Sequence, residues 1–325
     1  MKLKLLPAAI VAASTFTSGA YAADMTVYGK ANLTLNNYDL ESDDVENWQL
    51  ESNASRVGVK GSLAINDNLK AIYKMEFEVY IDDGDSGASK DNDTFEQRNI
   101  YAGIQGGFGT VIAGKHDTPT KLAQSKIDKF NDLPLGDIKN LFEGENRESN
   151  IVMYTTPDMD GLTFTGAFIP GETNEDDSIA DGISVALSYN KESLYLALAV
   201  DDEVDSRDTM RAVAEYTIGD AKLGFMYQTV ELSDSSVFED DEDGFLVSGE
   251  YKVAPSWVLK AQYGYNETED EDGDEGEYTQ LTFGADYKLS KATKVFAYYS
   301  TIEADEDGSD DTDDTTFAVG YELKF

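Results

Sequence analysis

Few residues in this chain of 325 have the type and spacing that catalysis requires. The single histidine, His116, would act as the general base of a hydrolase, but no serine is recognisably placed beside it. Glu76 and Glu78 could form a carboxylate pair, yet they lie two residues apart on one face of a strand, and a strand face that lines a water-filled interior would explain them without catalysis. The chain has no cysteine, which excludes thiol nucleophiles and Cys-ligated zinc. We therefore expect that the protein is not an enzyme.

Acidic residues dominate the sequence, whose formal net charge is −39. This charge argues against nucleic acid as a partner, because phosphates would be repelled. Three segments, residues 231–243, 267–277 and 303–314, together hold 23 of the 64 acids and no Lys or Arg. Solvated, charge-rich loops are the simplest interpretation of these segments. If they face the cell exterior, they could also bridge divalent ions to lipopolysaccharide or enrich cations at an entrance.

One of these acidic segments approaches the spacing of a calcium-binding loop. Glu239, Asp241 and Asp243 stand at alternate positions, followed by Gly244 and, further on, Glu250. No helices are expected on either side, and acid-rich loops produce such matches by chance. We expect loose binding of surface Ca²⁺ or Mg²⁺ at Glu239, Asp241 and Asp243, with no specific metal site and no cofactor.

The first 22 residues have the pattern of a secretory signal peptide. Lys2 and Lys4 accompany an apolar stretch at residues 5–13, and Ala20-Tyr21-Ala22 fits a cleavage site. We expect residues 23–325 to form a single domain after export. No later segment offers about 18 consecutive apolar residues, so membrane residence would have to depend on strands.

From Met25 onward, apolar and polar or small residues alternate with a period of two, which is typical of β-strands. The final segment is the clearest example, because Phe317, Val319, Tyr321, Leu323 and Phe325 alternate with Ala318, Gly320, Glu322 and Lys324. The same alternation runs through residues 69–79 and 281–289. An antiparallel β-sandwich would alternate as well. The 19 Tyr and 15 Phe, many near strand ends, favour a membrane barrel with aromatic girdles.

The connections between the expected strands alternate between short and long. Seven short ones lie at residues 66–68, 106–109, 157–161, 190–193, 219–220, 254–256 and 290–292. Eight long ones are centred on Ser42, Gly84, residues 117–149, Asp176, Asp202, Asp240, Asp272 and Asp310. Fifteen connections predict an all-β, 16-stranded antiparallel transmembrane β-barrel with tight periplasmic turns and longer external loops. Counts of roughly 14 or 18 strands remain alternatives.

Several segments form a recognisable series along the chain: Val27-Tyr28-Gly29-Lys30, Ser55-Arg56-Val57-Gly58-Val59-Lys60-Gly61, Gln97-Arg98-Asn99-Ile100-Tyr101-Ala102-Gly103, Arg147-Glu148-Ser149-Asn150 and the terminal Phe325. In order and spacing they resemble strands of the general, trimeric porins of Gram-negative bacteria. The resemblance covers the whole mature chain, clearly in strands and weakly in loops. It implies a homotrimer in the outer membrane, surrounded by lipids and lipopolysaccharide. Small residues expected on outward faces, Gly29, Ala31 and Gly58, would permit close packing between barrels.

In that family the third loop folds into the barrel and narrows it, and residues 117–149 match this loop. The resemblance implies basic residues on the barrel wall opposite acids on the loop. The matching wall positions are Lys30, Arg56 and Arg98, with Lys115 and Arg147 as further members, and the candidate loop acids are Asp132, Asp137 and Glu143. The alternation independently turns Lys30 and Arg56 inward, because their neighbours are apolar and charges facing lipid are costly.

The long loop also carries signals of order. Thr118 and Pro119 predict a helix cap and first turn, and Leu122, Ile127 and Phe130 predict an apolar face. The alternative is a flexible external loop.

These features predict a channel for passive diffusion of small hydrophilic solutes and ions, and the net acidity predicts a preference for cations. One alternative is a barrel adhesin or receptor that acts through its acidic external loops. Another is a barrel lipid hydrolase, which would depend on His116.

Overall fold

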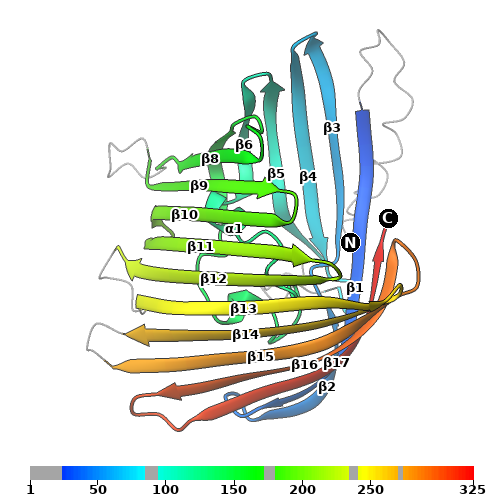
Figure 1. The fold of residues 1–325 in the computed structure, drawn as a ribbon, viewed down its shortest axis with the longest axis vertical. Helices are drawn as coiled ribbons and strands as arrows, with labels where there is room; N and C mark the ends of the chain where they lie inside the picture. The colour runs from blue at the N-terminus through cyan, green and yellow to red at the C-terminus, as the bar shows by residue number, and fades with distance from the viewer. Residues whose placement is uncertain (1–23, 85–93, 172–179, 234–240, 270–273) are drawn as a thin grey trace, which may run out of the picture.

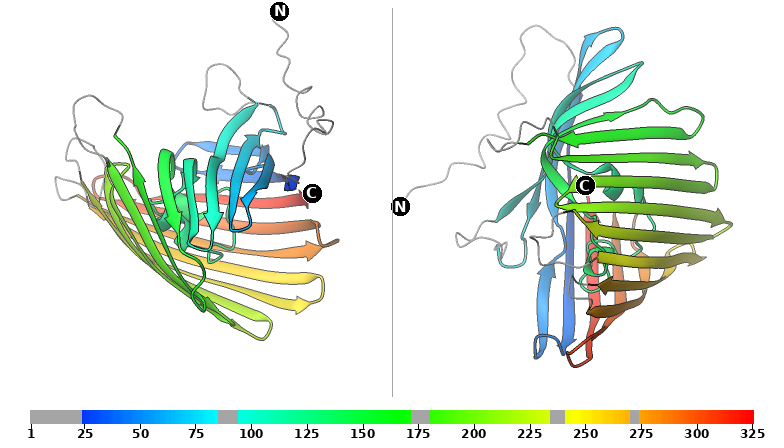
Figure 2. Two further views of the ribbon diagram at one scale, coloured as in Figure 1. Left: turned by 90° about the horizontal axis from the view of Figure 1, so that it is seen from above. Right: turned by 90° about the vertical axis from the view of Figure 1, so that its left-hand side faces the viewer.

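The computed structural model describes residues 24–84, 94–171, 180–233, 241–269 and 274–325, which form one antiparallel sheet (Figure 1). Its strands are β1 (Asp24–Leu40), β2 (Val45–Ser52), β3 (Arg56–Asn66), β4 (Leu69–Val79), β5 (Phe95–Gly106), β6 (Gly109–Asp117), β7 (Arg147–Thr155), β8 (Leu162–Ile169), β9 (Gly182–Lys191), β10 (Leu194–Val204), β11 (Arg207–Ile218), β12 (Ala221–Leu232), β13 (Asp241–Ala254), β14 (Trp257–Glu269), β15 (Glu275–Lys288), β16 (Thr293–Glu306) and β17 (Thr312–Lys324). Strand β1 pairs with β17 from Lys30↔Lys324 to Leu40↔Asp314, so the sheet closes into a barrel. Figure 2 shows the sheet curving around its interior from two further directions.

Strands β2 and β3 are two halves of one strand of the barrel wall. Both pair with β1: Leu33 faces Ser52 in β2, and Lys30 faces Arg56 in β3. Between these two pairs, the segment from Ser52 to Arg56 contains one residue more than the opposing segment of β1 from Lys30 to Leu33. This is the geometry of a β-bulge. Because β2 and β3 together form one strand of the wall, the seventeen segments make a barrel of sixteen strands. The predicted barrel is confirmed.

The alternation along each strand separates an outer apolar face from an inner polar one. Leu198 is 62% exposed and Leu223 is 58% exposed on the outside, whereas Gln228, Gln262 and Gln280 are fully buried on the inside. The predicted period of two is therefore confirmed. Apolar residues outside suit contact with lipid, where charged side chains would be costly. Among the described residues, no helix is long and apolar enough to cross a bilayer.

One glycine faces the opposite way from the prediction. Gly58 pairs with Tyr28, whose hydroxyl donates a hydrogen bond to the inward Glu76 carboxylate. Directly paired residues share a face of the sheet, so Gly58 points into the lumen. It lies two residues from Arg56 and must share its side, which makes the expectation of an outward Gly58 wrong.

The seven predicted short connections are confirmed, whereas two connections expected to be long are short: the one around Ser42 has only the four residues between Leu40 and Val45, and the other lies at Asp202. The seven tight turns lie at one end of the strands and the long connection between β6 and β7 starts at the other end. The connection expected to be long around Asp202 is a tight turn, because β10 continues to Val204 and β11 begins at Arg207. Asp205 and Ser206 both have positive φ, at 55° and 60°. This is the backbone geometry of a two-residue hairpin turn that matches the strand twist.

The terminal Phe325 completes the seam of the barrel. Its backbone forms two hydrogen bonds with Gly29, of 2.9 Å and 3.1 Å, next to the β1–β17 pairing. A Cβ atom at Gly29 would lie 2.3 Å from the Phe325 ring. A side chain at position 29 would therefore require the terminal aromatic ring to move. The predicted signal peptide, residues 1–22, lies outside the described residues and stays a prediction.

Candidate functional site

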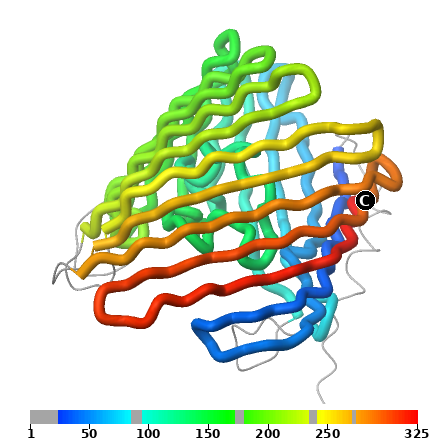
Figure 3. Tube along the Cα trace, turned by 60° about the horizontal axis from the view of Figure 1, so that its bottom comes forward, coloured from blue at the N-terminus to red at the C-terminus, as the bar shows by residue number. Residues whose placement is uncertain are grey.

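The connection between β6 and β7, residues 118–146, folds into the lumen, and we call it the constriction loop. In Figure 3 its green tube lies inside the ring of strands. It begins with α1 (Pro119–Ala123), where Thr118 is the N-cap and its side chain accepts a hydrogen bond from the Lys121 backbone N–H. The predicted cap and the proline in the first turn are confirmed. Ile127 and Phe130 are buried as expected, whereas Leu122 is 42% exposed and the prediction for it is wrong.

The constriction loop is fastened to the wall by polar side chains of the inner face. Arg211 of β11 is fully buried, and its Nη1 lies 2.7 Å from Glu145 Oε1. Its other guanidinium nitrogens donate to Gln228 and to the Glu143 carbonyl. Further along the loop, carbonyl oxygens accept hydrogen bonds from wall amides, namely Leu141 from Asn266, Gly136 from Gln262, and Leu135 from Gln280. These bonds satisfy buried carbonyl groups that the two short helical turns of the loop do not pair.

Glycines on four neighbouring strands provide the space into which the apolar side chains of the loop pack. They are Gly224, Gly244, Gly264 and Gly284, one each on β12, β13, β14 and β15. A Cβ atom at Gly264 would lie 2.3 Å from Leu141 Cδ2, and one at Gly244 would lie 2.7 Å from the Phe142 ring. At Gly224 and Gly284 the nearest loop side chains, Ile127 and Phe130, are at 3.0 Å and 3.1 Å. The inner wall from β12 to β15 is thus shaped to hold the loop.

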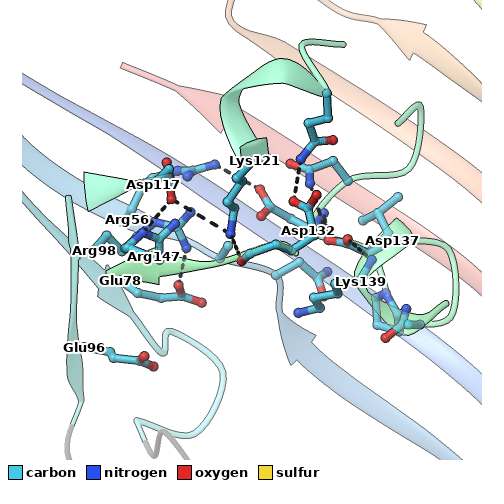
Figure 4. Close-up of a pocket in the computed structure, with 18 of the residues that line it drawn as sticks. Arg56, Glu78, Glu96, Arg98, Asp117, Lys121, Asp132, Asp137, Lys139 and Arg147 are labelled. Carbon is cyan, nitrogen blue, oxygen red and sulfur yellow. Dashed lines mark hydrogen bonds and ion pairs between the residues drawn. The ribbon is translucent and has the colours of Figure 1, made fainter. Parts of the chain in front are cut away.

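The other side of the constriction loop faces a cavity of 680 Å³ (Figure 4). Six of its lining residues are basic: Arg56, Arg98, Lys121, Lys126, Lys139 and Arg147. Six are acidic: Glu78, Glu96, Asp117, Asp132, Asp137 and Glu145. Formal charges of both signs therefore face the same water-accessible space in equal numbers.

Asp132, at the loop tip, bridges the basic residues of β1 and β3. Its Oδ2 lies 2.5 Å from Lys30 Nζ and 2.9 Å from Arg56 Nη2. Burial alone would raise the pKa of the Asp132 carboxyl, but these two cations hold it below its usual value. The arrangement of Lys30, Arg56 and Asp132 that the family resemblance implied is present in the structure.

Arg98 and Arg147 are paired with acids of the wall and not with acids of the loop. Arg98 Nη1 lies 2.5 Å from Glu78 Oε2, and its Nε lies 3.4 Å from Glu76 Oε1. Arg147 Nε lies 2.9 Å from Asp117 Oδ1. The lumen wall therefore contains ion pairs between its own basic and acidic residues. This fits the expectation that Glu76 and Glu78 line a water-filled interior.

The remaining candidates occupy different environments. Asp137 lines the cavity, yet its carboxylate accepts hydrogen bonds from the Lys139 and Asp132 backbone N–H groups and caps η2 (Ile138–Asn140). Burial raises the pKa of this carboxyl. Glu143 lies toward β11, with its carboxylate 3.9 Å from Arg207, and it does not line the cavity. Lys115 pairs with Ile100 in the β5–β6 ladder and does not line it either.

Sequence reasoning missed six charged residues of the cavity: Glu96, Asp117, Lys121, Lys126, Lys139 and Glu145. Four of them, Lys121, Lys126, Lys139 and Glu145, lie on the constriction loop, where no periodic pattern indicates which side chains face inward. Glu96 alternates with Arg98 along β5, so the period of two could have identified it.

Neither metal chemistry nor hydrolysis gains support from the described part of the chain. Glu239 lies outside it, Asp241 and Asp243 lie on β13, and no cluster of three acidic or histidine side chains there is arranged to hold a metal ion. His116 Nδ1 lies 2.8 Å from the Asp117 carbonyl, and its ring packs against Tyr101 at 5.1 Å. His116 is therefore a contact of the lumen wall.

Comparisons with known proteins place the chain in a family. A family model described as Gram-negative porin matches residues 8–307. "Outer membrane porin protein 32" of Delftia acidovorans is 25% identical over 320 residues, which cover 91% of this chain and 88% of that protein. The "Monosaccharide porin" of a Halomonas species is 24% identical, with 82% and 76% of the two chains covered. The "Anion-selective porin from Comamonas acidovorans" is similar in structure, with a TM-score of 0.75, 18% identity, and 93% and 100% of the two chains covered. The chain therefore belongs to the Gram-negative porin family and is a β-barrel protein of the outer membrane.

Proposed function

We propose that this porin is a water-filled channel for the passive diffusion of small hydrophilic solutes and ions, and that it has no enzymatic activity. The observation that carries the proposal is the cavity beside the constriction loop, where cations and carboxylates line the same space. Fixed charges in a narrow lumen bind and orient water and polar solutes. An apolar solute would have to displace that water, so hydrated solutes pass preferentially.

We further propose a preference for cations, which arises at the external mouth. Two cavities of 350 Å³ and 390 Å³ lie around the rim of this mouth, on the outward-facing side of the ends of β12–β17, because Asp243 and Glu267 alternate with the inward Gly244 and Asn266. One is lined by Glu231, Asp241, Glu242, Asp243, Glu267, Glu269, Glu275 and Glu277, and the other by Glu41, Glu277, Glu303, Asp305, Asp311 and Asp313. Neither is lined by Lys or Arg among the described residues. A negative potential of this kind raises the local concentration of cations.

The constriction supports only a weak selectivity of its own, because its lining charges balance. The Comamonas porin is described as anion-selective, but at 18% identity the likeness concerns the fold. The Halomonas relative is described as a monosaccharide porin, and a neutral sugar is one solute that a channel of balanced charge would admit.

Conductance in a planar bilayer tests both proposals. Steady single-channel conductance is expected, with a reversal potential that indicates cation preference at about 0.1 M salt. Because the Debye length falls from about 10 Å at 0.1 M to about 3 Å at 1 M, a preference that arises at the mouth should weaken at high salt. Anion preference at low salt would contradict the cation proposal. Absence of conductance would favour the adhesin or receptor function instead.

We also propose a homotrimer that contacts outer-membrane lipids and lipopolysaccharide. The family membership supports this, and the acidic external loops could bind divalent cations loosely between the protein and lipopolysaccharide. Of the small residues expected to face neighbouring barrels, Gly29 is covered by the Phe325 ring. Native mass measurement of the detergent-solubilised protein tests the proposal, since a monomer would contradict it.

A further inference from the structure

A second charged cavity lies at the opposite end of the barrel from the acidic loops. It has a volume of 660 Å³ and is bounded by the turn between β13 and β14 and by the hairpin of β15 and β16. Its charged lining residues are Lys288, Lys291, Lys294, Lys324, Asp286 and Glu322. We call this cavity the lysine vestibule. Because it lies at the tight turns, it opens toward the periplasm.

The excess of lysine in the vestibule is unlike the rest of the chain. The sequence has 64 acids against 25 basic residues, yet four lysines accompany two acids here. The lining of the vestibule shares no residue with the lining of the constriction cavity. It is therefore a separate site with its own charge.

Both carboxylates of the vestibule are already paired with lysine. Asp286 lies 2.9 Å from Lys294 and 3.3 Å from Lys260, which approaches it from β14. Glu322 lies 2.9 Å from Lys324. Within the described residues, no carboxylate is within 4.0 Å of the ammonium group of Lys288 or Lys291. These two lysines provide positive charge that the protein itself does not neutralise.

The register of the strands places lysines directly opposite each other on the inner face. Lys288 pairs with Lys294 in the β15–β16 ladder, and Lys30 pairs with Lys324 in the β1–β17 ladder. Like charges in directly opposed positions destabilise a sheet. In these pairs Lys30, Lys294 and Lys324 each have a carboxylate partner, whereas Lys288 has none within the described residues, so an anion bound beside Lys288 would relieve the repulsion that remains.

We propose that the lysine vestibule binds polyvalent oxyanions of the phosphate class that arrive from the periplasm. Lysine ammonium groups bind phosphate as point charges, and the cavity has the size typical of small-molecule sites, about 300–1,000 Å³. The site would hold an anion at the inner end of a channel whose outer mouth is acidic. It is independent of the selectivity proposed for the mouth.

Calorimetric titration of the purified, folded porin with pyrophosphate tests this proposal. The measurement is made at about 0.01 M salt, where the Debye length is about 30 Å and the lysines are little screened. Saturable binding is expected in the wild type. In the double variant K288Q/K291Q, binding should weaken about 5- to 20-fold, because two exposed charges each contribute a few-fold. The matched control is K191Q, which removes a lysine at the same end of the barrel but outside the vestibule, where it pairs with Asp160.

Three outcomes would overturn the proposal. They are absence of saturable binding in the wild type, equal binding by the wild type and K288Q/K291Q, and loss of binding in R98Q alone, which would place the anion at the constriction. If the double variant fails to fold, K291Q alone, in the exposed turn, carries the same test with a few-fold expected loss. Conductance of the wild type is measured separately, so the channel function can stand even if the vestibule proposal fails.

Discussion

Replacing Asp132 with asparagine should shift the ion selectivity of the channel toward anions. Asp132 is the acid that bonds to both Lys30 and Arg56. In the variant, six basic residues and five acids would line the cavity, compared with six of each in the wild type. Arg56, which lines the cavity, would then face the solute path without its carboxylate, and the more buried Lys30 would lose the same partner.

The size of this shift follows from Coulomb's law. A unit charge about 4 Å from a passing ion contributes about 1 kcal/mol in water. Loss of one negative charge disfavours a cation and favours an anion by that amount, which is about 2 kcal/mol in the permeability ratio. With a Debye length of about 10 Å at 0.1 M salt, about two-thirds of this effect remains, so the ratio of cation to anion permeability should fall about tenfold.

Reversal potentials across a planar bilayer, in a KCl gradient of about threefold around 0.1 M, measure this ratio. Asp132→Glu keeps the charge and should resemble the wild type. Asp67→Asn, in the exposed turn between β3 and β4, is the matched control for removal of one acid. If Asp132→Asn folds normally and its reversal potential is unchanged, Asp132 does not lie beside the ion path and the electrostatic reasoning is refuted.

Three further predictions concern the packing and the protonation of the constriction loop. Arg211→Met should destabilise the protein by about 3–5 kcal/mol, because it leaves the Glu145 carboxylate buried and unpaired; thermal unfolding in detergent measures this, and adding Glu145→Gln should recover part of the loss. Gly264→Val should displace the loop or cost about 1–3 kcal/mol, because even a Cβ atom would lie 2.3 Å from Leu141 Cδ2; unchanged single-channel conductance together with unchanged thermal stability would argue against the packing described. The pKa of Asp132 is below its usual value of 3.8, so its ion pairs stabilise the fold above about pH 4. This contribution is lost as the pH falls through the lower, folded-state pKa. Thermal unfolding between about pH 6 and pH 2 should therefore show a steeper loss of stability below pH 4 in the wild type than in Asp132→Asn.

The period of two was sufficient to predict the barrel and the direction of most side chains. Successive strand residues point to opposite faces, and lipid outside with water inside makes the two faces chemically different. Lys30 and Arg56 were therefore assigned to the lumen without knowledge of the tertiary structure, and the family resemblance added Arg98. The outward assignment of Gly58 was wrong because it departed from this same rule.

The constriction loop is where the sequence was insufficient. Its length, its helix cap at Thr118 and two of its three apolar residues were readable from the chain. The sequence did not show which acids of the loop face the cavity. Glu145 lines the cavity, whereas Glu143 does not.

The strands and the constriction loop differ in how far the sequence alone determines their structure. The alternation predicted that this chain forms a membrane barrel, because each strand must satisfy lipid on one side and water on the other. Only the tertiary structure decided how the loop is placed, since its position depends on Arg211 and on glycines that are distant in sequence. A strand repeats its environment every second residue, whereas an irregular loop takes its orientation from the partners it contacts.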